Sequence, residues 1–350
     1  MRVLITGAFG MIGRKLTARL LKDGVVAGKA ISELHLQDIV KPTPSAVIPA
    51  KAGISVTKNA LDQNGDSRFR GNDGAKISSH TGDLAAKGEA AKLAALNPDV
   101  VFHLAGIVSG IAESDFDLGY RVNFHGTLAL FDALRLAKIS PRVVYTSTIA
   151  VFGAPFPAVI PDDFHLTPLT SYGAQKMVGE ALLADYTRKG IFDGIGIRLP
   201  TICVRPGKAN GAASSFFSGI IREPLAGQEA ILPVPRDVVH THASPRSAVN
   251  FLIHAAGLDG DLIGPRRNLT MPGVGVTVQE QIDALRAVAG NNVVSLIKDQ
   301  PDEIIWAIVK NWPTRFDAKR ARDLGFVAER NFEEIVRAHI ADELNGQLHH

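Results

Sequence analysis

With 350 residues, 46% of them hydrophobic and 21% charged, the chain can bury a large core as one domain or as two unequal lobes. Its net charge of +3 gives no ground for a nucleic-acid or membrane partner, and its single cysteine, Cys203, excludes an internal disulfide framework and a multi-cysteine metal site. Because the first residues already read as a buried strand and no apolar run approaches the ~20 residues that cross a bilayer, we expect a cytoplasmic protein.

The first predicted elements are a strand at residues 3–6, a glycine-rich turn and a helix that opens near Met11. The glycines are Gly7, Gly10 and Gly13, and apolar residues recur at helical spacing after them. A pyrophosphate needs backbone without Cβ atoms in its path and the N–H groups of a helix N-terminus. Purely structural turns also use glycine, but the flanking strand and helix favour a dinucleotide-binding turn here.

The second and third predicted strands each end near a carboxylate. Asp38 stands at the end of "ELHLQDIV" and can accept hydrogen bonds from both hydroxyls of an adenosine ribose. The same carboxylate would repel a 2′-phosphate, which favours NAD over NADP, while Arg14 leaves NADP as an alternative. Asp83 in "HTGDL" suits either the adenine amino group or the N-cap of a helix.

Residues 42–77 separate these two strands and lack sustained periodicity. They are rich in Gly, Pro, Asn and Asp, and "VIPAKAGI" and "DSRFRGNDG" resemble peptides encoded by dispersed bacterial repeat elements. Without this segment the connection has an ordinary loop length. We therefore expect a poorly ordered surface insertion with no part in catalysis; a lid over the adenosine end is the alternative.

Two further strands are predicted, one within residues 99–106 and one within residues 141–153. The alternation of strands and helices predicts an α/β fold, a Rossmann-type doubly wound parallel sheet with a smaller C-terminal α/β substrate lobe. Ligands of such sheets lie beyond the carboxyl ends of the strands.

Hydroxyl groups and a tyrosine–lysine pair follow the fifth strand. Ser147 and Thr148 stand at its end, and "TSYGAQKMVGE" places Tyr172 and Lys176 four residues apart on one helix face. A phenol with a pKa of about 10 is a poor base at neutral pH, but a nearby ammonium and a nicotinamide cation would stabilise the phenolate. A solvated helix face is the alternative. Together with the glycine-rich turn, the pattern predicts that Tyr172 carries a proton.

Several motifs together resemble the extended short-chain dehydrogenase/reductase superfamily, the NAD-dependent epimerases and dehydratases. They are "TGAFGMIG", "HLAG", "TST", "YGAQK" and "RLPTICVRPG", and the resemblance covers the chain outside the insertion. It implies that Thr148, Tyr172 and Lys176 are catalytic, with Ser147 beside the substrate. It also implies NAD as the coenzyme, bound by Gly7, Gly10, Met11, Ile12, Gly13, Asp38, Asp83, Leu84, Leu104, Ala105, Gly106, Asn123, Tyr172, Lys176, Pro200 and Ile202.

The C-terminal half resembles the D-erythronate dehydrogenase branch of this superfamily through segments such as "NLTMPGVGVTVQEQIDAL" and "NWPTRFDAKRARDLGF". The resemblance implies NAD-dependent oxidation of C2 of a short sugar acid, D-erythronate to 2-oxo-tetronate, with Tyr172 as general base. A dehydratase is disfavoured because no acidic pair follows Thr148. An NAD-dependent nucleotide-sugar epimerase is the alternative, and a non-catalytic NAD-sensing protein is the least favoured one.

A sugar-acid substrate requires a partner for its carboxylate, and a bidentate arginine suits a planar anion. The candidates are Arg205 and Arg246, with Arg222 as a weaker third. His240 and His242 either bind substrate hydroxyls or are satisfied polar residues at a lobe junction. Since these alternating histidines lack a third nearby ligand, we expect no metal.

We expect residues 1–200 to form the NAD-binding Rossmann domain and residues 201–350 mainly the substrate-binding lobe, with a return to the main lobe near 240–257. The resemblance implies a homodimer in which the helices at about 112–138 and 172–190 pair with their copies. Burial of the apolar faces of these helices within one chain is the alternative.

Overall fold

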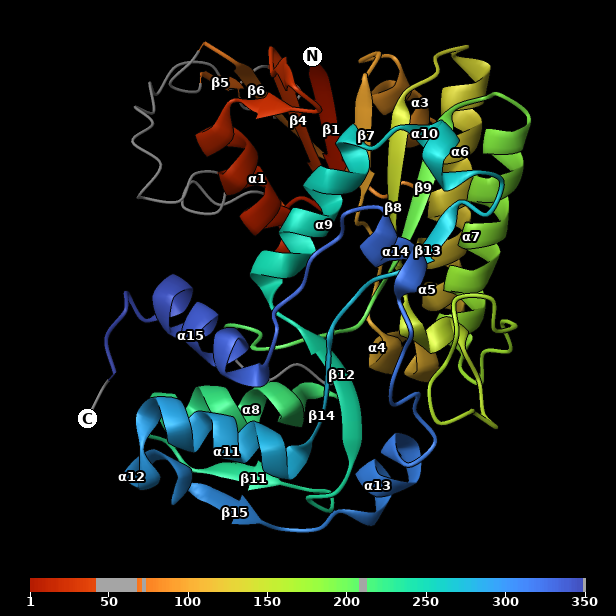
Figure 1. Ribbon diagram of the computed structural model, residues 1–350. Helices are drawn as coiled ribbons and strands as arrows, with labels where there is room; N and C mark the ends of the chain where they lie inside the picture. Colours follow the sequence, from red (N-terminus) through yellow and green to blue (C-terminus); the bar gives the residue numbers. More distant parts are fainter. Residues whose placement is uncertain (42–67, 71–73, 208–212, 349–350) are drawn as a thin grey trace.

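A twisted sheet runs through the larger of two lobes (Figure 1). The structure is a computed structural model that describes residues 1–41, 68–70, 74–207 and 213–348. All neighbouring strands of this sheet pair in parallel except β5, which runs antiparallel to β6 at one edge. In spatial order the strands are β13 (Asn268–Thr270), β9 (Asp193–Leu199), β8 (Arg142–Thr148), β7 (Val100–His103), β1 (Arg2–Thr6), β4 (Glu33–Asp38), β6 (Lys76–Thr81) and β5 (Arg68–Arg70).

The strand order reverses at β1, which lies between β4 and β7. In a parallel sheet of this kind, the crevice at the reversal, beyond the carboxyl ends of the strands, is the place where a nucleotide binds. The predicted Rossmann-type fold is confirmed. The glycine-rich turn follows β1 and therefore lies at this crevice.

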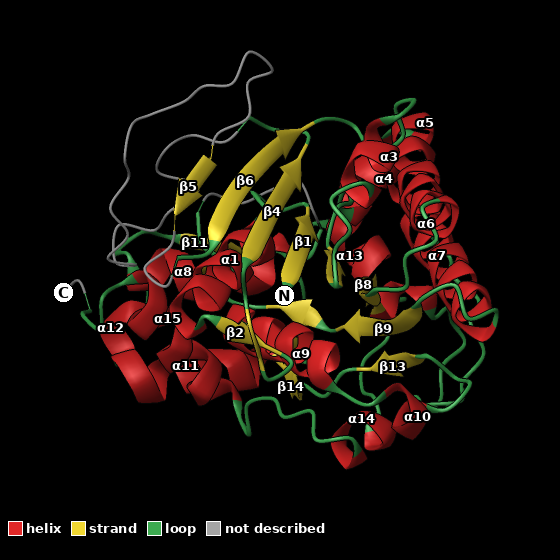
Figure 2. Cartoon of the chain, turned by 90° about the horizontal axis from the view of Figure 1, so that it is seen from above, coloured by secondary structure: helices red, strands yellow, loops and turns green. Residues whose placement is uncertain are grey.

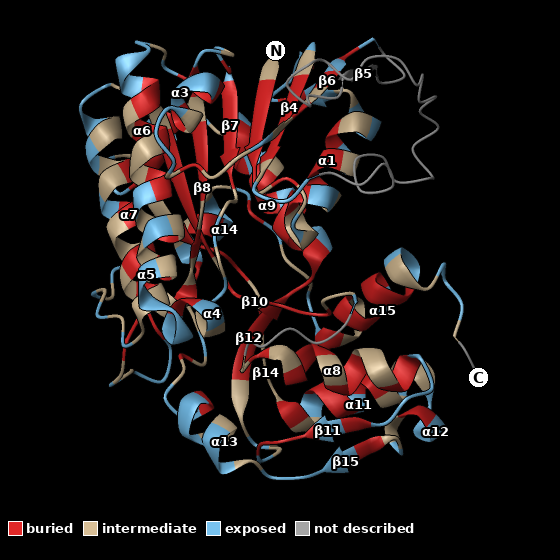
Figure 3. Cartoon of the chain, turned by 180° about the vertical axis from the view of Figure 1, so that it is seen from behind, coloured by how far each residue is buried: buried red, intermediate tan, exposed pale blue. Residues whose placement is uncertain are grey.

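Both faces of the sheet are covered by helices because successive side chains of each strand point to opposite faces. In β1, Val3 and Ile5 belong to one hydrophobic core and Leu4 to the other. Figure 3 shows these strands as buried between the layers. The first core is covered by α1 (Met11–Asp23) and α9 (Pro245–Gly257), and the second by α3 (Glu89–Ala94), α6 (Gly126–Leu136) and α7 (Ser171–Arg188) (Figure 2).

The helix expected at about 112–138 is divided into shorter elements. Asp115 has extended backbone dihedrals, and its carboxylate accepts a hydrogen bond from Leu118 N at 2.9 Å, which starts a new helix. A π-helical turn at Tyr120–His125 then carries Asn123; such turns often occur at functional sites. The successive helices are α4 (Ser109–Ser114), α5 (Phe116–Gly119) and α6.

The smaller lobe has its own hydrophobic core, with Phe217, Ile282 and Ile335 fully buried. Its strands β11 (Ala230–Leu232) and β15 (Ile297–Asp299) pair in parallel. They lie against α8 (Ser215–Leu225), α11 (Val278–Ala289) and α12 (Asn291–Val294), with α13 (Glu303–Val309) and α15 (Phe332–Glu343) nearby (Figure 1). Of the described helices, none is both long and apolar enough to span a bilayer.

The chain crosses between the two lobes several times. A small sheet of β10 (Thr201–Ile202), β12 (Val239–Ala243) and β14 (Val274–Thr277) joins them. After β12, α9 packs with α1 in the core of the larger lobe, and β13 extends the large sheet. α10 (Gly260–Ile263) and α14 (Lys319–Asp323) also lie in the larger lobe (Figure 1), as does the hairpin β2 (Val25–Val26) and β3 (Lys29–Ala30). This packing supports the proposed discontinuous division into lobes.

Part of the expected insertion belongs to the sheet. β5 pairs with β6, and β6 already begins at Lys76, within the expected limits of 42–77. Residues 42–67 and 71–73 of the insertion lie outside the described residues. Without β5, β6 would be the edge strand and would expose unpaired backbone N–H and C=O groups. Any extended segment can hydrogen-bond to such groups, so residues 68–70 can join the sheet without a strand-like sequence pattern.

Candidate active site

Each glycine of the turn after β1 has a different structural role. Gly7 has φ +70°, and a Cβ there would lie 2.7 Å from Ala105 N, so only glycine lets the turn approach β7. A Cβ on Gly13 would clash with Gly7 O, so glycine lets α1 pack directly on the turn. Gly10 is exposed and precedes α1 without a side-chain cap, which leaves the N–H groups of the helix N-terminus open to an anion.

The two predicted adenosine-binding carboxylates have different surroundings. Asp38 lies beside the glycine-rich turn, where its Oδ2 accepts a hydrogen bond from Phe9 N at 2.8 Å. A half-buried carboxylate at this place fits the ribose hydroxyls of an adenosine. Asp83 is engaged within the chain, since its Oδ1 accepts from Ala85 N at 3.0 Å and its Oδ2 pairs with Arg121. Asp83 does not cap a helix as the alternative predicted, because α3 begins only at Glu89 after Gly88; its carboxylate closes a turn instead, and contact with the adenine stays a prediction.

Tyr172 and Thr148 meet at the carboxyl end of β8. The hydroxyl of Thr170 caps α7 by accepting from Gly173 N at 3.1 Å, which places Tyr172 in the first helical turn. Thr148 Oγ1 accepts from Ala150 N at 3.1 Å, and its side chain also acts on the Tyr172 phenol. Burial raises the pKa of Tyr172 above its usual value of 10.0, whereas the charge of Arg205 and the Thr148 side chain act to lower it.

Lys176 lies one turn further along α7 and is buried. Its Nζ donates to Thr146 O at 3.0 Å and lies 4.9 Å from the centroid of the Tyr145 ring. Burial lowers the pKa of Lys176 from 10.5 to about 8. The cation that acts to lower the pKa of Tyr172 in this structure is Arg205, and the effect of Lys176 on Tyr172 stays a prediction.

Asn123 links the lysine to the turn after β7. Its Oδ1 accepts from Ile107 N at 2.9 Å, and its Nδ2 donates to Gln175 Oε1 at 2.8 Å. A Cβ on Gly106 would lie 3.0 Å from Asn123 Oδ1 and 3.4 Å from Lys176 Nζ. The predicted coenzyme-binding residues Gly106, Asn123 and Lys176 therefore converge at one place.

The remaining predicted coenzyme residues lie on segments that reach the carboxyl edge of the sheet. Two are in the first turn of α1, and the others follow β6, β7 and β9. In chain order they are Met11, Ile12, Leu84, Leu104, Ala105, Pro200 and Ile202.

Arg205 is the predicted carboxylate ligand whose charge acts on Tyr172. Its Nε donates to Ile202 O at 3.0 Å, and its Nη2 lies 3.4 Å from Ser214 Oγ. No acidic side chain among the described residues forms an ion pair with this partly buried guanidinium. Arg222 does not reach the site through its own head group but donates from Nη1 to Arg205 O at 2.8 Å.

Two other predicted substrate contacts are engaged elsewhere. Arg246 pairs with Asp342 at 2.6 Å on the protein surface, since it lies on the outer side of α9. Ser147 donates to Glu180 Oε1 at 2.5 Å and is buried. Because neighbouring side chains of a strand point to opposite faces, Ser147 and Thr148 do not face the same space. The structure thus does not bring Ser147 or Arg246 to Tyr172.

His240 and His242 lie at the junction of the lobes. His240 Nε2 is 2.7 Å from Thr201 Oγ1, and His242 Nε2 is 2.8 Å from Gln281 Nε2. Burial lowers the pKa of His240 from 6.5 to about 4 and that of His242 well below its usual value, so both rings are neutral. Within the described residues no group of His, Cys, Asp or Glu side chains is arranged to hold a metal ion.

Sequence reasoning missed two buried polar residues beside the site, His103 and Gln175. His103 Nδ1 is 2.7 Å from Thr6 Oγ1, and its Nε2 is 2.9 Å from Thr127 Oγ1. Burial lowers the pKa of His103 to about 3, so the ring is neutral. The signals were a histidine that ends the apolar run "VVFH" and an amide inside "YGAQK".

Comparison with known proteins decides the family. Residues 3–242 match the family model described as the NAD-dependent epimerase/dehydratase family, which is more than half of the chain. The chain belongs to the NAD-dependent epimerase/dehydratase family. The described residues fit NAD, the coenzyme of this family. The N-terminus of α1 has no side-chain cap and can receive the pyrophosphate, and Asp38 lies beside the glycine-rich turn, where it can receive the adenosine ribose.

Three similar proteins span nearly the whole length of this family member. A D-erythronate dehydrogenase of Cupriavidus necator is 41% identical over 346 residues and covers 98% of each chain. A D-erythronate dehydrogenase of Haemophilus influenzae is 37% identical and covers 97% of this chain and 99% of its own. The crystal structure of a nucleoside-diphosphate-sugar epimerase from Agrobacterium tumefaciens superposes with a TM-score of 0.90 at 56% identity, covering 100% of this chain and 96% of that one. This epimerase/dehydratase-family protein is an NAD-dependent dehydrogenase that acts on a CH–OH group.

Proposed function

We propose that this dehydrogenase oxidises the C2 hydroxyl of a short sugar acid, D-erythronate to 2-oxo-tetronate. The observation that carries the proposal is Arg205, a partly buried guanidinium without an acidic partner among the described residues, whose charge acts on Tyr172. A hydroxyl at Tyr172 and a carboxylate at Arg205 are the two groups that a 2-hydroxy acid carries on neighbouring carbons. The similarity to two D-erythronate dehydrogenases over almost the whole chain supports the same substrate class.

In the proposed mechanism Tyr172 takes the proton of the C2 hydroxyl. The Thr148 hydroxyl, whose side chain acts on the Tyr172 phenol, holds the substrate hydroxyl against the phenolic oxygen. NAD, when bound, supplies the acceptor for the hydride that leaves C2. Since burial raises the pKa of Tyr172, the phenolate is a strong proton acceptor once it forms, and Arg205 helps it to form.

Lys176 and Asn123 are proposed to act on the coenzyme side of the site. Within the described residues the Nζ of Lys176 donates to one acceptor, Thr146 O, and it lies near Gly106, so it can also donate to a nicotinamide ribose. Asn123 is held at both ends of its amide by Ile107 and Gln175, which gives it a fixed orientation. These contacts position the ribose rather than take part in proton transfer.

Substitution of Tyr172 by phenylalanine tests the assignment. General-base catalysis contributes about 10²–10⁴ in rate, so Tyr172→Phe should lower kcat for NADH formation by that factor. Calorimetry should show NAD binding within about twofold of the unsubstituted enzyme, because the ring remains in place. Undiminished oxidation by Tyr172→Phe would refute the role of this residue.

The substrate class is tested with a panel of C3 to C6 aldonic acids, with formation of NADH followed by absorbance. D-erythronate should give the highest kcat/KM of the panel. If none of the acids reduces NAD in the presence of the unsubstituted enzyme, the proposed substrate class is wrong.

Epimerisation of a nucleotide sugar is a second candidate activity of this site, because the similar solved structure from Agrobacterium tumefaciens carries that description. An epimerase interconverts two sugar nucleotides without net formation of NADH. Incubation with UDP-glucose and analysis of the products separates the two functions. The cytoplasmic location and the homodimer remain predictions from the sequence.

A further inference from the structure

A buried polar network connects the elements that carry the proposed catalytic residues. The Arg198 guanidinium binds the Glu180 carboxylate in a bidentate manner, with Nε at 2.9 Å from Oε1 and Nη2 at 2.7 Å from Oε2. Ser147 Oγ donates to the same carboxylate at 2.5 Å. Ser147 is in β8, Arg198 is in β9 and Glu180 is in α7, so three elements meet at one carboxylate.

Each member of this network lies next to a residue of the proposed site. Ser147 precedes Thr148, Glu180 follows Lys176 by one helical turn, and Arg198 stands two residues before Pro200. The side chains of Glu180 and Arg198 are only 1% and 8% exposed. A displacement of the carboxylate would therefore shift α7 relative to the ends of both strands, because there is no solvent gap to absorb the movement.

The stability of the fold does not explain why this ion pair is buried. Removing two charges from water costs about as much as their attraction returns, and apolar side chains of similar volume often do as well. A network of this kind is better suited to fixing one arrangement of its elements, since a bidentate contact loses its geometry with small shifts.

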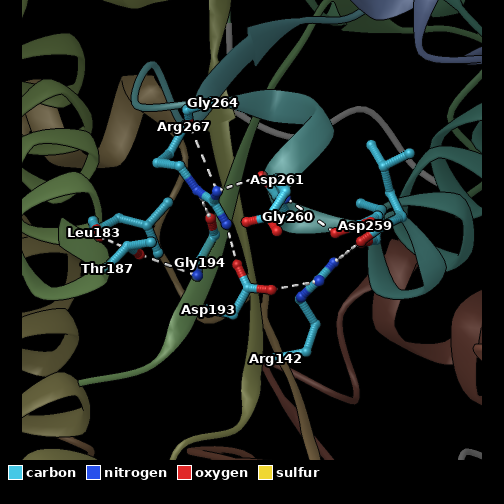
Figure 4. A network of polar contacts seen from close by, with 12 residues as sticks. Arg142, Leu183, Thr187, Asp193, Gly194, Asp259, Gly260, Asp261, Gly264 and Arg267 are labelled. Atoms are coloured by element: carbon cyan, nitrogen blue, oxygen red, sulfur yellow. Dashed lines mark hydrogen bonds and ion pairs between the residues drawn. The ribbon is translucent and has the colours of Figure 1, made fainter. Parts of the chain in front are cut away.

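The opposite ends of the same strands carry a second charged network (Figure 4). There the Asp193 carboxylate, at the start of β9, pairs with Arg142 from β8 and with Arg267 from the loop before β13. The Asp193 side chain is 41% exposed, and no proposed catalytic residue lies at these amino ends. Both networks tie the same strands together, and the second also reaches α7, because Gly194 N donates to Thr187 Oγ1 at 3.0 Å. The difference is that the central carboxylate of the first network, Glu180, itself stands in α7, whereas Asp193 stands in β9.

We propose that Glu180, held by Arg198 and Ser147, is a positioning residue that fixes α7 so that Tyr172 and Lys176 meet Thr148. This role rests on the proposed function of Tyr172 and Lys176. Glu180 does not touch the reacting atoms and acts through its neighbours on α7.

The charges around Lys176 give a readout that a purely structural role would not change. His103 from β7 and Tyr145 from β8 face Lys176, but burial lowers the pKa of His103 to about 3 and raises that of Tyr145, so both are uncharged. Glu180 is the carboxylate that raises the pKa of Lys176 against the effect of burial. Loss of Glu180 should therefore move the deprotonation of Lys176 to lower pH.

The test replaces the whole network by apolar side chains of similar size, with the substitutions Ser147→Ala, Glu180→Leu and Arg198→Met together. No buried charge is then left without a partner, so folding should be preserved. We expect kcat for D-erythronate oxidation, expressed per NAD site counted by calorimetry, to fall by about 10- to 100-fold, as for a displaced catalytic group. The loss of activity at alkaline pH should also begin at lower pH than in the unsubstituted enzyme.

Asp193→Asn is the matched control, because it weakens the other network of the same strands. It should lower the melting temperature and leave kcat and its pH profile unchanged. If the triple variant does not fold, Arg198→Lys keeps the charge without the bidentate contact and should lower kcat about tenfold.

Two outcomes separate the inference from the function on which it rests. Failure of the unsubstituted enzyme to oxidise any sugar acid would remove the proposed function itself. If the unsubstituted enzyme is active and both Arg198→Lys and the folded triple variant keep its kcat and pH profile, the positioning role of Glu180 is overturned.

Discussion

Replacing Arg205 with glutamine removes the charge that is proposed to bind the substrate carboxylate. The guanidinium is partly buried, its Nε is occupied by Ile202 O, and no described carboxylate neutralises it. A charged pair formed in such a place contributes about 2–4 kcal/mol to binding of the anion. Arg205→Gln should therefore lower kcat/KM for D-erythronate by about 30- to 1000-fold.

The assay compares D-erythronate with its neutral amide in both enzymes. The unsubstituted enzyme should prefer the acid by about the same factor, whereas Arg205→Gln should oxidise acid and amide with similar efficiency. The comparison is needed because Arg205 also lowers the pKa of Tyr172, so its loss moves the activity of the base to higher pH. That second effect acts on both substrates and cancels in the ratio of acid to amide.

Arg246→Gln is the control for this experiment. Arg246 pairs with Asp342 on the surface, and its substitution should leave the preference for the acid unchanged. A preference for the acid that survives in Arg205→Gln, or disappears in Arg246→Gln, would refute the assignment of the carboxylate site.

Three further predictions concern the coenzyme and the effect of pH on stability. Asp38→Ala removes the carboxylate that repels a 2′-phosphate, so kcat/KM with NADP should rise at least about tenfold relative to NAD; equal coenzyme preference before and after substitution contradicts the role of Asp38. Gly10→Ala puts a methyl group at the open helix N-terminus and should weaken NAD binding about tenfold in calorimetry with little change in melting temperature, whereas Gly13→Ala, whose Cβ meets Gly7 O, should lower the melting temperature. Burial lowers the pKa of His103 from 6.5 to about 3, so its contribution to stability is complete above pH 6.5 and is lost as the pH falls towards 3. By pH 5 the loss is about 2 kcal/mol in urea unfolding, and His103→Asn should reduce the difference between pH 7 and pH 5; an unaltered difference would show that this ring is not held neutral.

The positions of the glycine-rich turn, Asp38, Thr148, Tyr172 and Lys176 were accessible from the sequence because each depends on local order. A strand, a tight turn and a helix in succession determine where Gly7, Gly10 and Gly13 lie, whatever the rest of the chain does. The spacing of four residues between Tyr172 and Lys176 places them on one face of any helix. The Rossmann-type sheet followed from the alternation of strands and helices, and the observed strand order agrees with it.

The partners of charged and buried groups could not be obtained in this way. Arg205 and Arg246 looked equivalent as carboxylate ligands, yet the charge of Arg205 acts on Tyr172 and Arg246 pairs with Asp342, 96 residues further along the chain. Ser147 was expected beside the substrate, but its partner Glu180 is 33 residues away in sequence.

The sequence by itself determined the class of fold, the coenzyme-binding turn and the identity of the residues proposed for proton transfer. Tertiary structure alone decided which cation acts on Tyr172, which of the two candidate arginines has no acidic partner in the described part of the chain, and how Glu180 connects α7 with two strands. The physical reason is one of range: turn and helix geometry depends on neighbouring residues, whereas the electrostatics of a buried site depends on groups that only packing brings together.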